Sequence, residues 1–326
     1  MRILFVHNHP AKFVQIDLAL LREKHEVTEW YQRSRWVNLI ALTRAVGRAD
    51  LIVGWFASWH TFFPVLFGSF RRRPSILMVG GYDTANMPEI AYGSQRGGFK
   101  KWVSQTVMRK ATRLVMHSNY ACAEAVKNAG LDENKITVIY LGLDGQGSKS
   151  NAAKENLVIT VGNVDRINLQ RKGLEPFVRA AALLPGIPFV LIGEWKDDAI
   201  DHLKSIATPN VEFTNHVSET ELNNYLSRAQ VYVQASRHEG FGLAVAEAML
   251  RECVPVVTRA GALPEVVGEA GIYVDSTESS ALAGAVRAAL GAGDAQRRGA
   301  RERIEREFPL ERRREKLLAL IDQLGN

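Results

Sequence analysis

Short, continuous apolar runs alternate with helical patterns along almost the whole chain, and this alternation limits the possible folds more than any other feature. Apolar runs without a polar residue at every second position are typical of strands buried on both faces, as in a parallel sheet covered by helices. The pattern predicts strands in the first half at residues 2–6, 25–31, 51–55, 75–79, 113–117 and 135–140. It predicts strands in the second half at residues 157–161, 189–192, 211–214, 231–234 and 255–258.

Helical patterns fill the intervals, and a change in composition divides the chain. Helices are predicted at residues 13–24, 99–110, 174–184, 219–228 and 242–252. Ser218 and Glu221 form a capping box before the helix at 219–228. Residues 142–151 are rich in Gly, Ser, Asp and Asn, which is typical of a linker. We therefore expect domains at residues 1–150 and 151–308, and a C-terminal helix at 309–326 that packs back on the first domain. The expected fold class is α/β, with two doubly wound, Rossmann-like parallel sheets facing each other across a cleft.

The net charge of +6 is unevenly distributed. Residues 1–150 contain 20 Lys and Arg against 11 Asp and Glu, whereas the remainder contains 21 against 24. A basic half suggests an anionic partner, such as a membrane surface, a phosphorylated acceptor or a nucleic acid. A mixed surface with no such partner is the alternative. Nucleic-acid binding would rest on charge alone, and we do not expect it.

Residues 51–70 lack charged side chains and precede Arg71, Arg72 and Arg73. Such a segment could contact or cross a membrane. Their length would allow a bilayer span, but Gly54 and Pro64 interrupt them, and they also divide into a strand and a helix at residues 58–67. An interfacial role for this Arg-flanked, aromatic helix is favoured over a bilayer span. Two cysteines and no apparent signal peptide predict a cytoplasmic protein, with peripheral membrane contact as a possibility.

The segment that most directly indicates chemistry lies between the predicted strand 231–234 and helix 242–252. It contains Glu239, the glycine pair Gly240 and Gly242, and Glu247. A glycine turn at a helix N-terminus lets backbone N–H groups approach an anion, and carboxylates accept hydrogen bonds from sugar hydroxyls. A phosphate cradle flanked by two carboxylates suits a nucleotide-sugar. The alternative is a pair of solvent-facing glutamates.

The spacing of Glu239 and Glu247 around Gly-Phe-Gly resembles that of retaining GT-B glycosyltransferases of the glycosyl transferases group 1 type, family four. The resemblance extends over nearly the whole chain and is strongest at residues 157–275. Its other motifs are Val161-Gly162-Asn163, Arg171-Lys172-Gly173, Ile192-Gly193, His216-Val217-Ser218 and Gly261-Ala-Leu-Pro-Glu265.

The resemblance implies a role for each matching residue. Glu239 would contact hydroxyls of the transferred sugar, and Glu247 would hold the ribose diol. Arg171 and Lys172 would neutralise the departing diphosphate, where negative charge develops in the transition state. The diphosphate would meet the backbone N–H groups of Gly240, Phe241, Gly242 and Leu243. Other donor-binding positions would be Gly162, Asn163, Gly193 and Val217.

The resemblance also implies an activity. The donor would be a nucleotide-sugar such as a UDP- or GDP-sugar, and transfer would retain the anomeric configuration. The acceptor would be a glycan, a lipid-linked molecule or a small molecule. Neither a metal nor another cofactor would be required.

The chain departs from the family pattern at two positions. Asn163 stands where the family often has Arg. In Gly80-Gly81-Tyr82-Asp83, Gly80 stands where the family has a His that is thought to help hold the sugar, whereas Asp83 is retained. We expect Asp83 to take part in catalysis by binding acceptor or sugar, with a capping role for residues 84–87 as the alternative.

Two other functions share features with this interpretation. A sugar-nucleotide epimerase would have a similar two-domain architecture. A catalytically weak, nucleotide-sugar-binding partner subunit would fit the loss of the His at Gly80. A dehydrogenase and a P-loop enzyme are less expected, because neither Gly-x-Gly-x-x-Gly after a strand nor Gly-Lys-Ser/Thr occurs.

Overall fold

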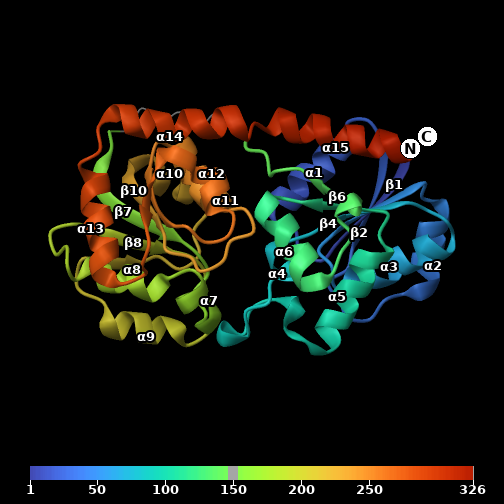
Figure 1. Ribbon diagram of the computed structural model, residues 1–326, viewed down its shortest axis with the longest axis horizontal. Helices are drawn as coiled ribbons and strands as arrows, with labels where there is room; N and C mark the ends of the chain where they lie inside the picture. Colours follow the sequence, from blue (N-terminus) through green and yellow to red (C-terminus); the bar gives the residue numbers. More distant parts are fainter. Residues whose placement is uncertain (146–152, 326) are drawn as a thin grey trace. The chain divides into compact units, whose positions relative to one another are not determined.

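The computed structural model describes residues 1–145 and 153–325, which form two compact α/β units (Figure 1). Unit 1 comprises residues 1–142 and 311–326, and unit 2 comprises residues 143–310. The change of unit at Gly142 and Leu143 falls at the start of the predicted linker. The rest of that linker, from residue 146 to 151, lies outside the described residues.

Unit 1 contains a six-stranded parallel sheet in the order β2-β1-β3-β4-β5-β6. Its strands are β1 (Arg2–His7), β2 (Glu26–Tyr31), β3 (Leu51–Trp55), β4 (Ser75–Met78), β5 (Arg113–Met116) and β6 (Ile136–Val138). Its helices of more than one turn are α1 (Lys12–Arg22), α2 (Leu39–Arg48), α3 (Trp59–Phe70), α5 (Gly98–Lys110), α6 (Asn119–Ala129) and α15 (Leu310–Gly325). The short helix α4 (Gly81–Thr84) follows β4 directly.

Unit 2 contains a second six-stranded parallel sheet, in the order β12-β11-β10-β7-β8-β9. Its strands are β7 (Glu155–Val161), β8 (Phe189–Ile192), β9 (Val211–Phe213), β10 (Ala229–Gln234), β11 (Val254–Thr258) and β12 (Ile272–Val274). Its helices are α7 (Arg166–Arg171), α8 (Leu174–Ala181), α9 (Ala199–Ile206), α10 (Glu219–Arg228), α11 (Leu243–Leu250), α12 (Leu263–Val267), α13 (Ser279–Leu290) and α14 (Asp294–Glu307). The strand order reverses between β7 and β10, as in a dinucleotide-binding Rossmann sheet.

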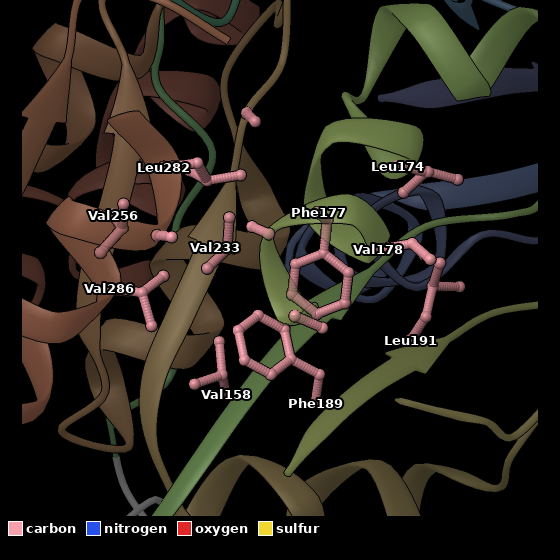
Figure 2. Packing of buried hydrophobic residues seen from close by; sticks show 14 of the residues in the cluster. Val158, Leu174, Phe177, Val178, Phe189, Leu191, Val233, Val256, Leu282 and Val286 are labelled. Atoms are coloured by element: carbon pink, nitrogen blue, oxygen red, sulfur yellow. The ribbon is translucent and has the colours of Figure 1, made fainter. Parts of the chain in front are cut away.

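The core of unit 2 explains why its strands read as continuous apolar runs. Figure 2 shows Val158, Phe189 and Val233 of the central strands packed against Phe177 of α8. The rings of Phe177 and Phe189 lie 5.2 Å apart, and both are almost fully buried. All four residues of β8 and all six of β10 are buried, because helices cover both faces of the sheet.

The predicted strands and the two doubly wound sheets are confirmed, whereas the positions of several other elements were not predicted. The capping box of Ser218 and Glu221 is present at the start of α10. The helices α2, α6 and α9 occupy intervals for which no helix bounds were predicted, and the edge strand β12 was not predicted. β12 is only three residues long and two of them are half-buried, so it lacks the apolar run that marks the central strands.

Residues 51–70 form the strand β3 and the helix α3 instead of one long apolar helix. Pro64 lies inside α3 and is accommodated there. None of the helices formed by the described residues combines the length and the apolarity that crossing a bilayer requires. Both cysteines are free thiols. The cytoplasmic location stays a prediction.

The helix α15 belongs to unit 1 from Glu311 onward and is held there by a buried ion pair. The Arg313 guanidinium donates to both carboxylate oxygens of Asp17 on α1, at 2.7 and 2.6 Å. Arg313 also donates to the carbonyl oxygens of Ile139 and Tyr140, at 3.1 and 3.0 Å, and Asp17 accepts a further hydrogen bond from the Trp55 indole. Every charge of this pair is therefore compensated inside the fold.

Candidate functional site

The candidate site lies at the carboxyl ends of β7 and β10, where the strand order of unit 2 reverses. Loops on either side of such a reversal diverge, since one leads to a helix on one face of the sheet and the other to a helix on the opposite face. Ligands of doubly wound sheets bind in the crevice that this leaves. Here β7 leads to Gly162 and Asn163, and β10 leads to the segment that carries Glu239.

Two cations are presented by the short helix that follows β7. Arg171 is the last residue of α7, Lys172 is its C-cap, and the left-handed Gly173 then starts α8. The Arg171 guanidinium donates to the side-chain oxygen of Asn168 at 2.9 Å and to the carbonyl oxygen of His238 at 3.3 Å. Arg171 is therefore oriented by its own helix and by the loop after β10.

Glu239 faces these cations, and four donors surround a single oxygen of its carboxylate. Oε1 lies 3.4 Å from Lys172 Nζ and 3.7 Å from an Arg171 guanidinium nitrogen. The same oxygen accepts hydrogen bonds from Gln234 Nε2 at 2.6 Å and from Ser236 Oγ at 3.0 Å. Within the described part of the chain no donor lies at hydrogen-bond distance from Oε2. The Glu239 side chain is 12% exposed, so the carboxylate lies mostly within the protein.

The protonation state of Glu239 follows from this environment. Burial by itself would raise the pKa of Glu239, but the charges of Lys172 and Arg171 and the Ser236 hydroxyl outweigh it and hold the pKa below its usual value. The carboxylate is thus ionised at neutral pH. The site can both accept hydroxyl hydrogen bonds and present two cations to an anion.

Two glycines permit the close packing of the loops around these side chains. A Cβ atom at Gly162 would lie 2.6 Å from Cδ of Lys172, so the lysine side chain crosses the face of this residue. A Cβ atom at Gly261, which follows β11, would lie 2.3 Å from the Glu239 carbonyl oxygen. The amide of Ala262 donates to that same oxygen at 2.9 Å. The loop after β11 therefore fixes the backbone of Glu239.

The glycine turn predicted after β10 is present and starts a helix. Gly242 has a φ of +99° and is the N-cap of α11, so the amides of the first helical turn begin at Leu243. Phe241 is buried and packs edge-to-face on Phe308, with ring centroids 5.4 Å apart. Glu247 lies within α11 and is half-buried. Gly240 precedes this turn directly and is half-buried as well.

The remaining predicted donor positions follow neighbouring strands of unit 2. Asn163 follows β7, and its carbonyl oxygen accepts from the side chain of Asn168 at 2.9 Å. Gly193 follows β8, and its amide donates to the Asn215 carbonyl oxygen at 3.1 Å. Val217 follows the edge strand β9 and precedes the N-cap of α10. All three lie at the carboxyl edge of the sheet, whereas the role of each in donor binding stays a prediction.

Asp83 belongs to unit 1 and has an evident structural role. It is buried in the one-turn helix α4, and Oδ2 accepts from the amides of Ala57 and Gly80, at 3.0 and 2.9 Å. Asp83 thus closes the first turn of its own helix, not residues 84–87. Burial raises the pKa of Asp83 to about 6, although these two hydrogen bonds oppose the shift. Its catalytic role stays a prediction.

The structure also explains why glycine occupies position 80. A Cβ atom at Gly80 would lie 2.8 Å from two carbon atoms of the Phe56 ring. Any larger side chain, including the His of the family pattern, would require Phe56 to move. Phe56 has a positive φ of 68°, which is uncommon for a non-glycine residue, so its position is constrained by the backbone.

Gln234 and Ser236 were missed as site residues in the sequence. Their hydrogen bonds to Glu239 depend on the bend of the chain after β10, which no residue pattern specifies. Ser236 and Glu239 are three residues apart, a spacing that could have suggested a local hydrogen bond.

Comparison with known proteins shows a family-model match over this site and a similar fold in a solved structure. The family model described as Glycosyl transferases group 1 matches residues 155–292. This stretch contains Arg171, Lys172, Glu239 and Gly261, the residues of the candidate site in unit 2. In its fold, the chain is similar to Anabaena HepE, whose crystal structure was determined in complex with UDP-glucose. The TM-score is 0.81 at 18% identity, over 99% of this chain and 100% of that one.

The sequence of the chain is also similar to those of proteins named for sugar transfer or glycogen synthesis. Glycogen synthase of Mycobacterium tuberculosis is 27% identical in an alignment of 326 positions that covers 89% of this chain and 76% of that protein. O-antigen chain mannosyltransferase B of Escherichia coli is 34% identical in an alignment of 123 positions that covers 34% of this chain. The chain matches only part of these relatives. Its alignment with the mannosyltransferase spans 32% of that protein, and its alignment with a 41.2 kDa protein from the cps region of Klebsiella pneumoniae spans 51% of that one. The α/β class with two doubly wound domains, as in GT-B glycosyltransferases, is confirmed. The cleft between the domains stays a prediction.

Proposed function

We propose that the protein is a glycosyltransferase that moves a sugar from a nucleotide-sugar to an acceptor with retention of the anomeric configuration. The observation that carries the proposal is the ionised Glu239 held against Lys172 and Arg171, at the point where the sheet of unit 2 reverses its order. Carboxylate, paired cations and a helix N-terminus at Gly242 meet there. The match of residues 155–292 to the Glycosyl transferases group 1 model supports this assignment.

The proposed reaction assigns a role to each part of this site. A diphosphate bound at the start of α11 lies where backbone amides and the helix dipole favour negative charge. As the bond from the anomeric carbon to the phosphate breaks, charge builds on the leaving oxygen, and Lys172 and Arg171 stabilise it. The acceptor hydroxyl then bonds to the anomeric carbon, and its proton passes to the departing phosphate. No separate base or metal is needed in this scheme.

Lys172 and Glu239 neutralise each other's charge in the structure, and a bound donor would change both partners. A diphosphate beside Lys172 supplies a second negative charge for it, while Oε2 of Glu239 accepts from sugar hydroxyls. Pairing in advance keeps both side chains ordered at a small entropic cost. The donor and the site would therefore be matched in charge and in hydrogen bonds.

The names of similar proteins narrow the substrates to be tested. UDP-glucose is bound by the Anabaena protein, and mannosyl transfer is named for the Escherichia coli one. We accordingly place UDP- and GDP-hexoses first as donors. A glycan or a lipid-linked glycan is the expected acceptor.

The deciding experiment is a mass-spectrometric screen of the purified protein against UDP-, GDP- and ADP-sugars, with and without glycan acceptors. NMR of the product then reads the anomeric configuration. We expect Glu239→Gln to lower turnover by ~10²-fold or more with an unchanged fold, because it removes a charge that acts at the reacting centre. Glu212→Gln, on the edge strand β9, is the matched control and should leave turnover unchanged.

Three results would contradict the proposal. Isomerisation of the donor without an acceptor would indicate an epimerase. Donor binding without turnover by any acceptor would indicate a binding subunit. Product of inverted configuration would remove retention while leaving sugar transfer intact.

A further inference from the structure

One surface of unit 1 exposes large aromatic side chains that the proposed reaction does not use. Trp36 lies in the loop before α2 and is 90% exposed. Phe99 and Trp102 lie at the start of α5 and are 64% and 53% exposed. Aromatic side chains of this size are seldom left in water without a partner.

The two segments are far apart in the sequence, and Trp59 at the start of α3 joins them. Its indole N–H donates to the carbonyl oxygen of Arg35 at 3.0 Å, next to Trp36. Its ring lies 5.8 Å from that of Phe99, which in turn lies 5.7 Å from Trp102. Figure 1 shows α2, α3 and α5 as neighbours in this part of unit 1. Residues 33–36 and 99–102 therefore form one aromatic–basic face.

Positive charge is concentrated around the same rings. Arg33 and Arg35 flank Trp36, and Lys100 and Lys101 lie between Phe99 and Trp102. Residues 32–110 contain twelve Lys and Arg against three Asp and Glu, so this stretch accounts for the whole excess of basic residues in the first 150.

The three acidic residues of this stretch do little to offset the charge of the face. Asp50 is paired with Arg2, at 2.7 Å. Asp83 is buried, and only Glu89 is left in the stretch.

We infer that the aromatic–basic face binds the surface of an anionic lipid bilayer. Tryptophan favours the boundary between lipid headgroups and hydrocarbon, where its ring is buried and its N–H stays hydrated. Lysine and arginine beside it are attracted by anionic headgroups. The face combines both, and its two segments reach the surface without any helix spanning the bilayer. The inference does not depend on sugar transfer, because no residue of the face belongs to the candidate site in unit 2.

Vesicle binding tests the aromatic part. The full-length protein is mixed with vesicles of phosphatidylcholine alone and with vesicles containing phosphatidylglycerol, and the bound fraction is measured by sedimentation. We expect binding to the anionic vesicles only. Trp36→Ser combined with Trp102→Ser should weaken it by about tenfold or more, since two buried rings are lost. The control pairs Val126→Ser with Leu183→Ser, two exposed apolar residues elsewhere, and should bind as the parent does.

A second pair of variants tests the charges. Lys100→Ser with Lys101→Ser should lower affinity for anionic vesicles by roughly fivefold for each charge removed, and high salt should remove the difference. Arg298→Ser with Lys316→Ser makes the same change in net charge on exposed positions outside the face. Equal loss in both variants would assign binding to net charge and overturn the inference.

Fluorescence distinguishes insertion from loose attraction. Lipids brominated near the headgroup should quench tryptophan emission, and quenching should fall when Trp36 and Trp102 are changed to Phe. Absence of vesicle binding overturns the inference, as does binding with unchanged quenching. A response to single-stranded oligonucleotide in place of vesicles would assign the face to nucleic acid instead.

Discussion

Lys172 pairs with Glu239, and the proposed mechanism gives its charge a second partner in the donor diphosphate. Its ammonium group lies 3.4 Å from Glu239 and lowers the pKa of that carboxyl. In the proposed mechanism, this single side chain would link the ionisation of Glu239 to stabilisation of the leaving group. The two effects separate in a pH profile, because only the first changes the ionisation of Glu239.

Lys172→Met should lower turnover by ~10²-fold or more, since a cation at a developing charge is lost. It should also move the acid limb of the pH–rate profile upward. Glu239 then loses the largest influence that lowers its pKa, so it becomes protonated at a higher pH. Lys204→Met, on the exposed face of α9, is the control. Steady-state rates between pH 4 and 8 check this, and an unmoved acid limb would argue against the coupling.

Gly261 allows close packing of its loop against the backbone of Glu239. Its φ is +60°, and a Cβ atom would come within 2.7 Å of both the carbonyl oxygen and the amide nitrogen of Glu239. Gly261→Ala should therefore shift the backbone of Glu239 and weaken donor use, even though residue 261 has no polar side chain. Gly299→Ala, where a Cβ atom meets nothing within 4 Å, should leave donor binding unchanged. Calorimetric titration with the best donor measures both, and similar affinities for the two variants would contradict this account.

Among the elements, α4 shows how one turn of helix can be held by a buried carboxylate. Asp83 binds two amides from different loops, and its burial raises its pKa to about 6 from an ordinary value near 3.8. A carboxyl with a raised pKa in the folded state binds its proton more tightly there than in the unfolded chain. Its contribution to stability is therefore largest below about pH 4 and is lost as the pH rises through 6.

Asp83→Asn should remove this dependence, because the amide keeps an oxygen acceptor for both N–H groups but has no proton to lose. The free energy of unfolding of the variant, minus that of the parent, should rise by ~3 kcal/mol between pH 4 and 7. Urea unfolding followed by tryptophan fluorescence measures it. Five of the six tryptophans lie in unit 1, so the signal reports mainly on the unit that contains α4. A difference that stays constant over this pH range would show that Asp83 titrates normally.

In the whole molecule, unit 1 includes the helix α15, which follows unit 2 in the sequence. Residues 1–142 form the sheet and most of its cover, and residues 311–326 return to complete it. Arg313 and Asp17 are separated by almost the full chain, and both are buried where they meet. Unit 1 is complete only when the C-terminal helix has been synthesised.

Arg313→Met should destabilise unit 1 by about 3–5 kcal/mol, because it leaves Asp17 as a buried charge without its partner. The neighbouring Arg314 pairs with Glu23 on the surface, so Arg314→Met should cost less than ~1 kcal/mol. Urea unfolding of the two variants, again by tryptophan fluorescence, compares them directly. A loss of stability for Arg313→Met no larger than that for Arg314→Met would contradict a stabilising role of the buried pair.

Local patterns of the sequence determined much of this protein. The apolar runs located the central strands, the pair Ser218 and Glu221 located the start of α10, and the segment from Glu239 to Glu247 located the glycine turn that starts α11. Phosphate binding by this turn stays a prediction. These features depend on residues within one element or one turn. Their physical causes, burial on both faces and capping of free amides, operate over a few residues and are therefore visible in order along the chain.

Only the tertiary structure decided which distant residues meet. It placed Gln234 and Ser236 on one oxygen of Glu239, Arg313 on Asp17, and Trp36 on the same face as Trp102. It also showed that Phe56 excludes a side chain at Gly80. Contacts of this kind arise from the order and twist of strands and from close packing between elements. No periodicity records them, because many sequences with the same pattern would bring different side chains together.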